Sequence, residues 1–419
     1  MAHALRSISR NLWGLSYQSS SLIYHCAIEP AVLYGAEIWG YATRKQQIRR
    51  KLLAIQRSCL ITVCRAYRTA PTSGLQVIAN SVPLDLKASE RYWDFQLRHF
   101  SDQLAISETT PTQVKDIAVK IHNHGSDRFS DYYLLHPATD PPDVVLCTDE
   151  NKNIATKFYT DGSKGLMGVG AAFVEIDCNN RVVHQAYYKL GPFCTINQAE
   201  SLAILKSLEH IQRTINNRTK EEITIISDSR VALHQIKAMN TKFKLIKDII
   251  HMVSNLKSNH IKVHFHWTKG HSGEIGNDKA DFLAKKAISH LNDPTFSLVP
   301  YKWVKNQLKE FTINRWQERW ATEMTGRVTF NFFPDVKGRD KLSHFNPDFH
   351  ITQYITGHDG FKQYLNRFLN KVTSICECQE EDETPEHILF TCVKHVTHRK
   401  QLKHVMYQYS QEFHWPCRS

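Results

Sequence analysis

The order of hydrophobic patterns between residues 155 and 290 constrains the fold more than any other feature of this chain. Short or alternating apolar segments, typical of strands, occur at 157–160, 171–176, 182–190, 223–226 and 261–267. Apolar residues at helical spacing occur at 197–215, 230–239, 243–256 and 276–289. The first three strands are joined by short segments, including a Gly-rich turn predicted at 162–170, which favours an antiparallel meander. We therefore expect an α/β fold, a mixed five-stranded sheet with flanking helices, over residues 154–290.

The segments on either side have other patterns. Residues 1–100 are predicted to be helical, whereas 101–153 show no clear helical or strand periodicity, which favours a connector. Residues 295–419 are aromatic and basic, with helices expected at 308–320 and 361–369. No run of about 18 apolar residues occurs, so we expect no membrane partner. Without a secretory signal the ten cysteines are expected to be reduced, in an intracellular protein of the nucleus or cytoplasm.

Positive charge is concentrated near the N-terminus. The formal net charge of the chain is +12, and residues 1–70 contain ten Lys or Arg but only two acids, Glu29 and Glu37. A block of this kind fits nucleic acid as a partner. A solvated helix face explains the same charge run equally well. No feature of the sequence points to a protein partner.

Four acidic residues lie at the ends of predicted strands or on the helices beside them. Asp161 and Asp228 end two strands that we expect to be neighbours in the sheet, so that the two aspartates converge. Glu200 lies in the first turn of a helix, and Asp281 lies on the last helix. Carboxylates brought together raise one another's pKa, and a divalent cation relieves that repulsion. Oxygen ligands favour Mg²⁺ or Mn²⁺ over zinc, and two such ions can promote displacement at a phosphate. One strand-end aspartate is more often a turn or cap residue, so the interpretation depends on all four.

The strings around these acids resemble those of a known enzyme family. Tyr-Thr-Asp-Gly-Ser at 159–163, Ser-Asp-Ser at 227–229 and Trp-Thr-Lys-Gly-His-Ser-Gly at 267–273 follow one another in a single order. With them, residues 154–290 resemble the type 1 ribonuclease H domain, whose fold has the same order of strands and helices. The resemblance implies an endoribonuclease that cuts the RNA strand of RNA–DNA hybrids with two Mg²⁺ or Mn²⁺ ions.

The resemblance also assigns roles to individual residues. It implies that the catalytic, metal-binding acids are Asp161, Glu200, Asp228 and Asp281. It implies that His271 assists product release or the orientation of water. Asp278 is a rival for the fourth acid, but the family spacing of ten residues after the histidine selects Asp281.

Substrate contacts follow from the same resemblance. The family reads consecutive 2′-hydroxyls near the first strand and the first helix start, which distinguishes RNA from DNA. The matching positions in this chain are Gly162, Ser163, Asn197 and Gln198. Each of these residue types is equally common as a turn or cap residue, and that alternative stays open.

A Cys/His cluster lies near the C-terminus: Cys376, Cys378, His387 and Cys392. Zinc accepts three sulfurs and one imidazole, although a one-residue gap between the first two cysteines is tight and ordinary buried thiols are the alternative. His395 and His398 are competing ligands. Preceded by Thr-Gly-His-Asp-Gly at 356–360 and Tyr-Leu-Asn-Arg-Phe at 364–368, the cluster resembles the C-terminal knuckle of arthropod non-long-terminal-repeat retrotransposon polyproteins. The resemblance implies that this knuckle binds nucleic acid or staples a small domain.

The N-terminal region resembles the same kind of polyprotein. The segments 32–39, 55–57, 67–69 and 83–85 resemble the thumb of its reverse transcriptase. No Tyr/Phe-x-Asp-Asp polymerase motif occurs, so we expect a truncated copy that cannot polymerise by itself.

Three hypotheses follow. The first is an active hybrid ribonuclease, supported by the complete acid set. The second is an inactive nucleic-acid-binding remnant, supported by the absent polymerase motif and the N-terminal charge. The third, a transposase or integrase, is disfavoured by the string at 267–273.

Overall fold

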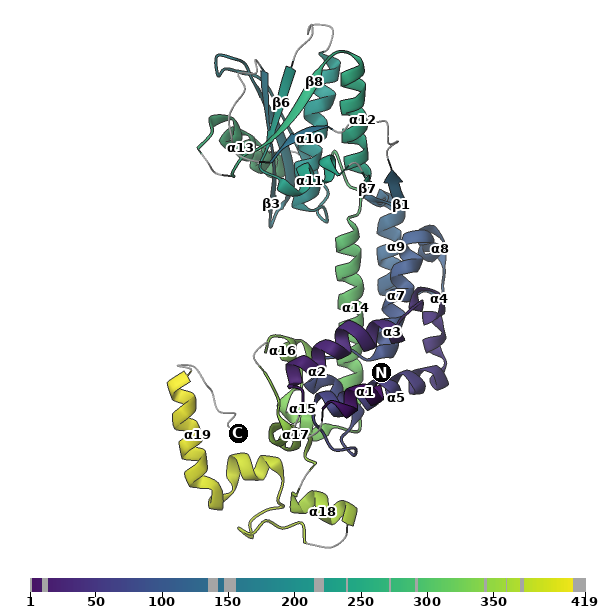
Figure 1. Ribbon diagram of the computed structural model, residues 1–419, viewed down its shortest axis with the longest axis vertical. Coiled ribbons are helices and arrows are strands. Elements are labelled where there is room, and N and C mark those ends of the chain that lie inside the picture. Colours follow the sequence, from purple (N-terminus) through teal and green to yellow (C-terminus); the bar gives the residue numbers. More distant parts are fainter. Residues whose placement is uncertain are drawn as a thin grey trace. The chain divides into compact units, whose positions relative to one another are not determined.

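The computed structural model divides the chain into two compact units (Figure 1). One unit comprises residues 94–308, and the other combines residues 1–93 with 309–419. The structure describes residues 2–9, 14–134, 142–146, 156–214, 222–238, 240–270, 273–290, 293–342, 345–358, 360–369 and 373–409.

A mixed sheet forms the centre of the 94–308 unit. Among the described residues it has six strands in the order β2-β8-β6-β3-β4-β5. Their bounds are Asp143–Val145 (β2), Thr156–Gly165 (β3), Gly168–Ile176 (β4), Val182–Leu190 (β5), Glu222–Ser227 (β6) and Lys262–Trp267 (β8). The strands β3, β4 and β5 form an antiparallel meander, and β6, β8 and β2 join in parallel. The predicted mixed sheet is confirmed.

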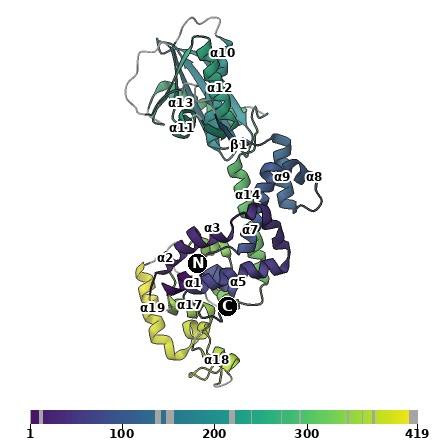
Figure 2. The same cartoon turned by 45° about the vertical axis from the view of Figure 1, so that its right-hand side comes forward.

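Helices cover both faces of this sheet. They are α10 (Ile196–Arg213), α11 (Arg230–Lys237), α12 (Lys244–Ser258) and α13 (Ile275–His290). One hydrophobic cluster joins α10, α11 and α12 to the face that carries Phe158, and a second joins α13 to the face that carries Tyr159. Figure 2 shows α10 and α12 together against the sheet. Because both faces are covered, β4 is buried almost throughout instead of alternating.

Two predictions about this unit were wrong in detail. The Gly-rich segment 162–170 is not a long turn, because β3 runs to Gly165 and β4 begins at Gly168, which leaves only Leu166 and Met167 between them. The segment 101–153 contains regular structure that the sequence analysis missed: α8 (Ser101–Ile106), α9 (Thr112–His124), β1 (Arg128–Leu134) and β2. The strand β1 pairs with β7 (Asn240–Phe243), and β2 adds the sixth strand to the sheet.

The other unit is helical, as predicted. Its N-terminal helices are α1 (Ala2–Ser7), α2 (Tyr17–Ile23), α3 (Glu29–Val32), α4 (Ala36–Trp39), α5 (Gln46–Val63), α6 (Thr72–Ile78) and the first part of α7 (Leu84–His99). Its C-terminal helices are the end of α14 (Tyr301–Thr322), α15 (Arg327–Phe332), α16 (Val336–Asp340), α17 (Phe349–Thr356), α18 (Lys362–Leu369) and α19 (Val396–Tyr409). Leu60, Leu75 and Ile355 belong to a core that the two chain segments share.

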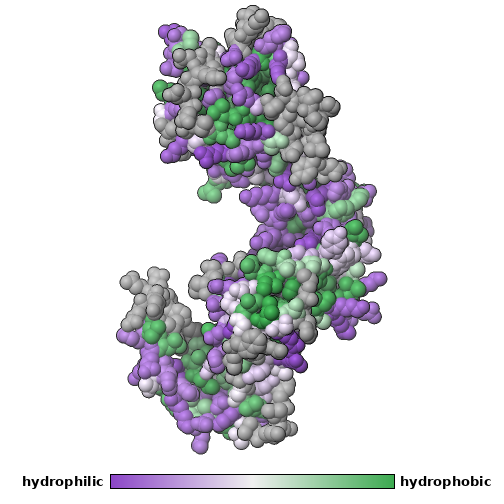
Figure 3. Space-filling view, in the orientation of Figure 1, coloured by the Kyte–Doolittle hydropathy of each residue, from purple (hydrophilic) through white to green (hydrophobic). Residues whose placement is uncertain are grey.

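Polar contacts also join the two segments of this unit. The Arg319 guanidinium donates to both carboxylate oxygens of the buried Asp85, at 3.0 and 2.7 Å. The Thr352 hydroxyl donates to the carbonyl oxygen of Cys64 at 2.7 Å. Figure 3 shows apolar side chains gathered on the surface over α2 and α3, where Leu22 is 64% exposed. A helix able to cross a membrane is absent from the described part of the chain.

Candidate active site

Sheet register brings two of the predicted acids together. The strands β3 and β6 are parallel neighbours in which Thr160 pairs with Ser227. Asp161 is the next residue of β3, which runs on to Gly165, so it lies inside its strand and not at the strand end that the sequence predicted. Asp228 directly follows the last residue of β6, and the parallel register places the two aspartates side by side. The Trp267 indole nitrogen donates to the carbonyl oxygen of Asp228 at 3.0 Å, which fixes the chain where it leaves β6. The predicted adjacency of these strands is confirmed.

The third acid is placed by a close approach of helix to strand. A Cβ atom added at Gly162 would lie 2.6 Å from the backbone nitrogen of Glu200 and 2.9 Å from Ala199 Cβ. Only glycine therefore lets the first turn of α10 lie this near to β3. The Ser229 hydroxyl donates a hydrogen bond to Glu200 Oε2, which ties this carboxylate to the segment that carries Asp228.

The fourth acid comes from α13, on the opposite face of the sheet. A Cβ atom added at Gly276 would lie 2.2 Å from the Tyr159 ring, so glycine again permits the close packing of helix on strand. Asp281 Oδ2 accepts a hydrogen bond from Lys285 Nζ at 2.6 Å. The carboxylates that raise the pKa of Asp161 include Asp281 and do not include Asp278.

Burial and mutual repulsion raise the pKa values of two of these acids. Asp161 is 6% exposed, and burial together with Asp228 raises its pKa to about 8 against the opposing backbone N–H of Gly162. Burial and Asp228 likewise raise the pKa of Glu200 to about 7, against the hydrogen bond from Ser229. Burial is the larger cause of both pKa shifts, and the contribution of Asp228 to each of them indicates that the three carboxylates lie close together. An all-oxygen donor set whose charges need compensation fits a hard divalent cation such as Mg²⁺ or Mn²⁺.

The remaining predicted residues have different surroundings. Ser163 continues β3 and pairs with Gly170, and Asn197 is exposed in the first turn of α10. Gln198 is 6% exposed and forms a capping box with Thr195, the cap alternative that the sequence had left open. The predicted His271 lies outside the described residues.

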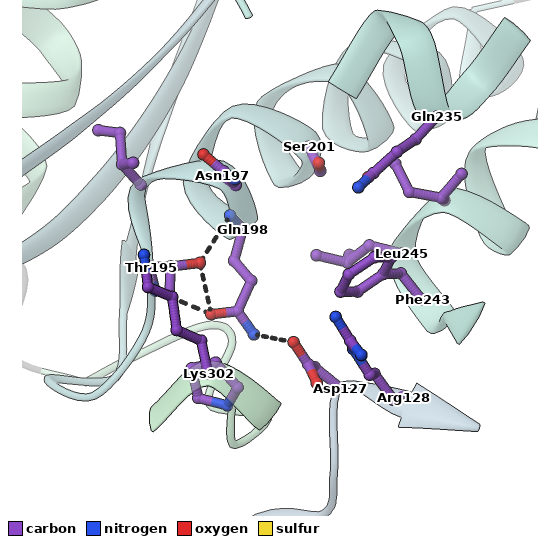
Figure 4. Close-up of a pocket in the computed structure, with 13 residues that line it drawn as sticks. Asp127, Arg128, Thr195, Asn197, Gln198, Ser201, Gln235, Phe243, Leu245 and Lys302 are labelled. Atoms are coloured by element: carbon purple, nitrogen blue, oxygen red, sulfur yellow. Dashed lines mark hydrogen bonds between the residues drawn. The ribbon is translucent and has the colours of Figure 1, made fainter. Parts of the chain in front are cut away.

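A pocket of about 200 Å³ lies beside the first turn of α10 (Figure 4). Asn197, Ser201 and Gln235 line it together with Arg128 from β1 and Lys302 from the start of α14. Arg128 and Lys302 lie outside residues 154–290, and no sequence signal connected them to the acids.

Asp127 joins this pocket to the α10 cap. Its Oδ1 accepts from the backbone N–H of Tyr301 at 3.1 Å, and its Oδ2 accepts from Gln198 Nε2 at 3.3 Å. Burial raises the pKa of Asp127 to about 6. The chain segments before and after the sheet are therefore hydrogen-bonded to the helix that carries Glu200.

The predicted Cys/His cluster also comes together in space. One ligand atom from each of Cys376, Cys378, His387 and Cys392 lies within 4.8 Å of all the others. The Sγ atoms of Cys376 and Cys392 are 3.8 Å apart, and Cys378 Sγ lies 3.1 Å from His387 Nε2. A tetrahedral zinc ion with Zn–S bonds of about 2.3 Å places two sulfurs about 3.8 Å apart, so these donors fit zinc. The group does not include His395 or His398.

Neighbouring polar groups orient this histidine. His387 is 3% exposed, and its Nδ1 lies 3.0 Å from Glu381 Oε2 and 2.9 Å from Thr391 Oγ1. A carboxylate at Nδ1 favours the tautomer that leaves Nε2 without a proton. The nitrogen that faces Cys378 is therefore the one prepared to act as a ligand.

Comparisons with known proteins relate the part of the chain that carries the acids to a known family. The RNase H family model matches residues 153–289. A ribonuclease H from Francisella tularensis subsp. novicida is 33% identical over 146 residues, which cover 32% of this chain and 90% of that protein.

The chain is also similar to larger proteins and to solved structures. A retrovirus-related Pol polyprotein from type-1 retrotransposable element R1 2 of Nasonia vitripennis is 36% identical over 77 residues, 18% of this chain. This chain spans only 19% of the length of that polyprotein. A crystal structure of LC11-RNase H1 in complex with RNA/DNA hybrid covers 32% of this chain and 96% of its own, at 22% identity and a TM-score of 0.27. Prototype foamy virus protease-reverse transcriptase covers 35% of this chain and 22% of its own, at 20% identity and a TM-score of 0.27.

Proposed function

Because this chain belongs to the ribonuclease H family, we propose that it is an endoribonuclease that hydrolyses the RNA strand of RNA–DNA hybrids. The observation that carries the proposal is the convergence of Asp161, Glu200 and Asp228, with Asp281 coupled electrostatically to them. Four carboxylates from two strands and two opposing helices cost the fold stability, as the raised pKa values of two of them indicate. Such a cost is typical of active sites.

The same four acids would hold two divalent cations, Mg²⁺ or Mn²⁺. Bound there, such ions would supply Lewis-acid activation of water and neutralise charge on the scissile phosphate. The residues of the chain hold the acids in place. The Ser229 hydroxyl orients Glu200, the Gly162 N–H holds Asp161 Oδ1, and the Trp267 indole fixes the backbone of Asp228. His271 would assist product release or water orientation, as its place in the family motif implies.

Substrate contact is proposed along the first turn of α10. Gly162 and Ser163 follow Asp161 directly, and the exposed Asn197 lines the pocket three residues before Glu200. Arg128 and Lys302 supply positive charge to that pocket, which suits a phosphate of the hybrid. Gln198 contributes to substrate binding indirectly, because its amide holds in place the start of α10, which carries Asn197.

We further propose that Cys376, Cys378, His387 and Cys392 hold a structural zinc ion. The support is the mutual approach of the four donors and the carboxylate that orients His387. A set of four protein ligands leaves no open position, which is typical of structural zinc sites. The thumb-like origin of residues 1–100 and the assignment of residues 295–419 to a helical C-terminal region, with its knuckle at 376–392, are further proposals.

The decisive experiment is a cleavage assay with the full chain. We expect a 5′-labelled RNA strand in an RNA–DNA hybrid to be cut in Mg²⁺ or Mn²⁺, and the same RNA in double-stranded RNA to stay intact. Asp228→Asn should lower the rate by about 10³-fold or more, because it removes a charged metal ligand and leaves the fold in place. Asp278→Asn, on the same helix as Asp281, is the matched control and should stay within about threefold of wild type.

The alternative is an inactive remnant that binds nucleic acid. It predicts that the folded wild-type chain cuts no faster than Asp228→Asn at any concentration of either ion, while both bind the hybrid equally. That result would sink the enzymatic proposal.

A further inference from the structure

Three sequence motifs that play no part in the acid cluster meet in the helical unit. They are the segments 67–69, 356–360 and 364–368. Thr69 Oγ1 accepts a hydrogen bond from the Tyr364 hydroxyl at 2.9 Å and lies 3.1 Å from His358 Nδ1. The rings of His358 and Tyr364 are 4.8 Å apart. Residues nearly 300 positions apart in the chain thus form one polar cluster.

Two guanidinium groups act on this cluster. Burial lowers the pKa of His358 to about 4, and the charges of Arg57 and Arg367 add to that effect. The imidazole is therefore neutral at physiological pH, because burial and, to a smaller extent, the two arginines disfavour a positive charge on it. An anion placed among these groups would be attracted by both arginines.

The loop that carries Thr69 is held in a fixed shape. Arg57 Nη1 donates to the carbonyl oxygen of Ala70 at 2.7 Å and to Thr72 Oγ1 at 2.8 Å, and Arg57 Nη2 donates to the carbonyl oxygen of Arg68. Preorganised loops of this kind bind with a smaller loss of conformational entropy.

Tyr364 and Arg367 lie on α18, and this helix is anchored by hydrogen bonds at its first turn. The backbone N–H of Lys362 donates to Glu383 Oε1 at 3.1 Å, and Gln363 Nε2 donates to Asp382 Oδ2 at 3.4 Å. Both acceptors belong to the loop between Cys378 and His387. The helix that presents Tyr364 and Arg367 is therefore docked on the Cys/His cluster.

The outer side of this cluster faces solvent. Arg68, Thr69 and Arg367 are exposed, and the Tyr67 ring is 39% exposed while its inner edge packs on Phe349 at 5.6 Å. Hydroxyl and guanidinium donors are the groups that contact nucleic-acid phosphates, and an exposed aromatic ring can stack on an unpaired base. Exposed donors and a partly exposed ring thus occur within the chain segments that meet at this cluster.

We propose that this surface, formed by Tyr67, Arg68, Thr69, His358, Tyr364 and Arg367, binds the backbone of a single-stranded nucleic acid. Arg367 and the Thr69 hydroxyl contact a phosphate, Tyr364 holds Thr69 in place through its hydrogen bond, and Tyr67 stacks on an adjacent base. A single strand suits the site better than a duplex because the Tyr67 ring needs a base face that pairing and stacking in a duplex would cover. The site lies in the unit that does not contain the catalytic acids, so the inference is independent of the proposed hydrolysis.

The test is binding of a fluorescein-labelled 20-nucleotide single-stranded DNA by the full chain, followed by anisotropy across a range of NaCl concentrations. Single-stranded DNA is not a substrate of the proposed hydrolysis, so the two proposals can fail separately. Arg367→Gln should weaken binding about fivefold and reduce the slope of log K against log salt by about 0.7, the loss of one phosphate contact. Thr69→Val, which keeps the shape of an exposed side chain, should weaken binding about threefold.

Lys337→Gln is the matched control, because it removes one exposed positive charge elsewhere in the same unit. We expect it to change affinity less than twofold. Circular dichroism melting establishes which variants are folded, and Thr69→Val decides the test if Arg367→Gln is not. Affinity and salt slope equal to wild type in the folded variants, or losses no greater than that of Lys337→Gln, would overturn the proposal.

Discussion

The acid cluster and the Cys/His cluster are built in opposite ways. The four acids come from residues 161 to 281 and meet only because a sheet and two helices are formed, whereas the four Cys/His ligands lie within 17 residues. The acids repel one another, and two of their pKa values are raised. The Cys/His ligands are already arranged around a common point and one is oriented by Glu381. The first arrangement costs the fold stability, as is typical of active sites, and the second would provide local stability through the proposed zinc ion.

The largest expected difference lies in catalysis. Asp161→Asn should abolish hybrid cleavage, with a loss of about 10³-fold or more, because it removes one carboxylate from the cluster. Zinc content, measured by atomic emission, should stay at that of wild type. Loss of zinc from this variant would show that the two clusters are not independent.

A substitution in the Cys/His cluster should have the opposite pattern of effects, with zinc lost and cleavage retained. Cys392→Ser removes a buried ligand from the second cluster, so the purified chain should lose its zinc equivalent and the C-terminal residues should become sensitive to protease. Hybrid cleavage should fall no more than about threefold. A variant that keeps a full zinc equivalent would exclude the proposed ligand set.

Without metal, the free energy of unfolding should depend on pH through the acid cluster. The folded pKa of Asp161, about 8, lies above its usual value of 3.8, so its protonated form stabilises the fold fully below pH 4. That stability is lost as pH rises through about 8. Asp161→Asn should therefore be more stable than wild type at pH 8.5 in EDTA, by on the order of 3 kcal/mol. The difference should shrink as the pH falls and vanish below about pH 4, as thermal melts would show, and a difference independent of pH would contradict the raised pKa.

The smallest expected effect concerns the orientation of His387. Glu381→Gln replaces the carboxylate at Nδ1 with an amide and should weaken zinc affinity about 10- to 100-fold, measured by competition with a chelator. Glu380→Gln, at the preceding position, is the matched control and should change affinity less than threefold. Equal effects of the two substitutions would show that Glu381 acts only through its charge and not through its contact with His387.

The sequence predicted those parts of the structure that short patterns determine. The strands, the helices of residues 154–290 and the adjacency of Asp161 and Asp228 follow from hydrophobic period and strand order. The helix α9 was missed although Val114, Ile117, Ala118 and Ile121 have helical spacing, because polar residues surround them in a short segment. The strand β2 was missed because three residues carry no measurable period.

Contacts between residues far apart in the chain could not be predicted from the sequence. Nothing in the string Asn-Gln-Ala-Glu indicated that the Gln198 amide would bond to Asp127, which lies 71 residues earlier. The role of Gly162 as a point of close approach to Glu200 likewise depends on packing that no local pattern encodes. For Gln198 the cap alternative, which the sequence could not separate from substrate contact, is the one that the hydrogen bonds support.

The capping box of α10 has a consequence for how such a domain is inherited. Gln198 bonds to Asp127 and to the carbonyl oxygen of Leu298, both outside the residues that the family model matches. A recombination event that moved only residues 153–289 into another gene would leave the Nε2 atom of this residue, which is 6% exposed, without these two acceptors, although its oxygen would keep the capping-box contact with Thr195. The chain segment that could be transferred with all its contacts is therefore longer than the segment that carries the acids. It has to include Asp127 and Leu298, the two partners of Gln198.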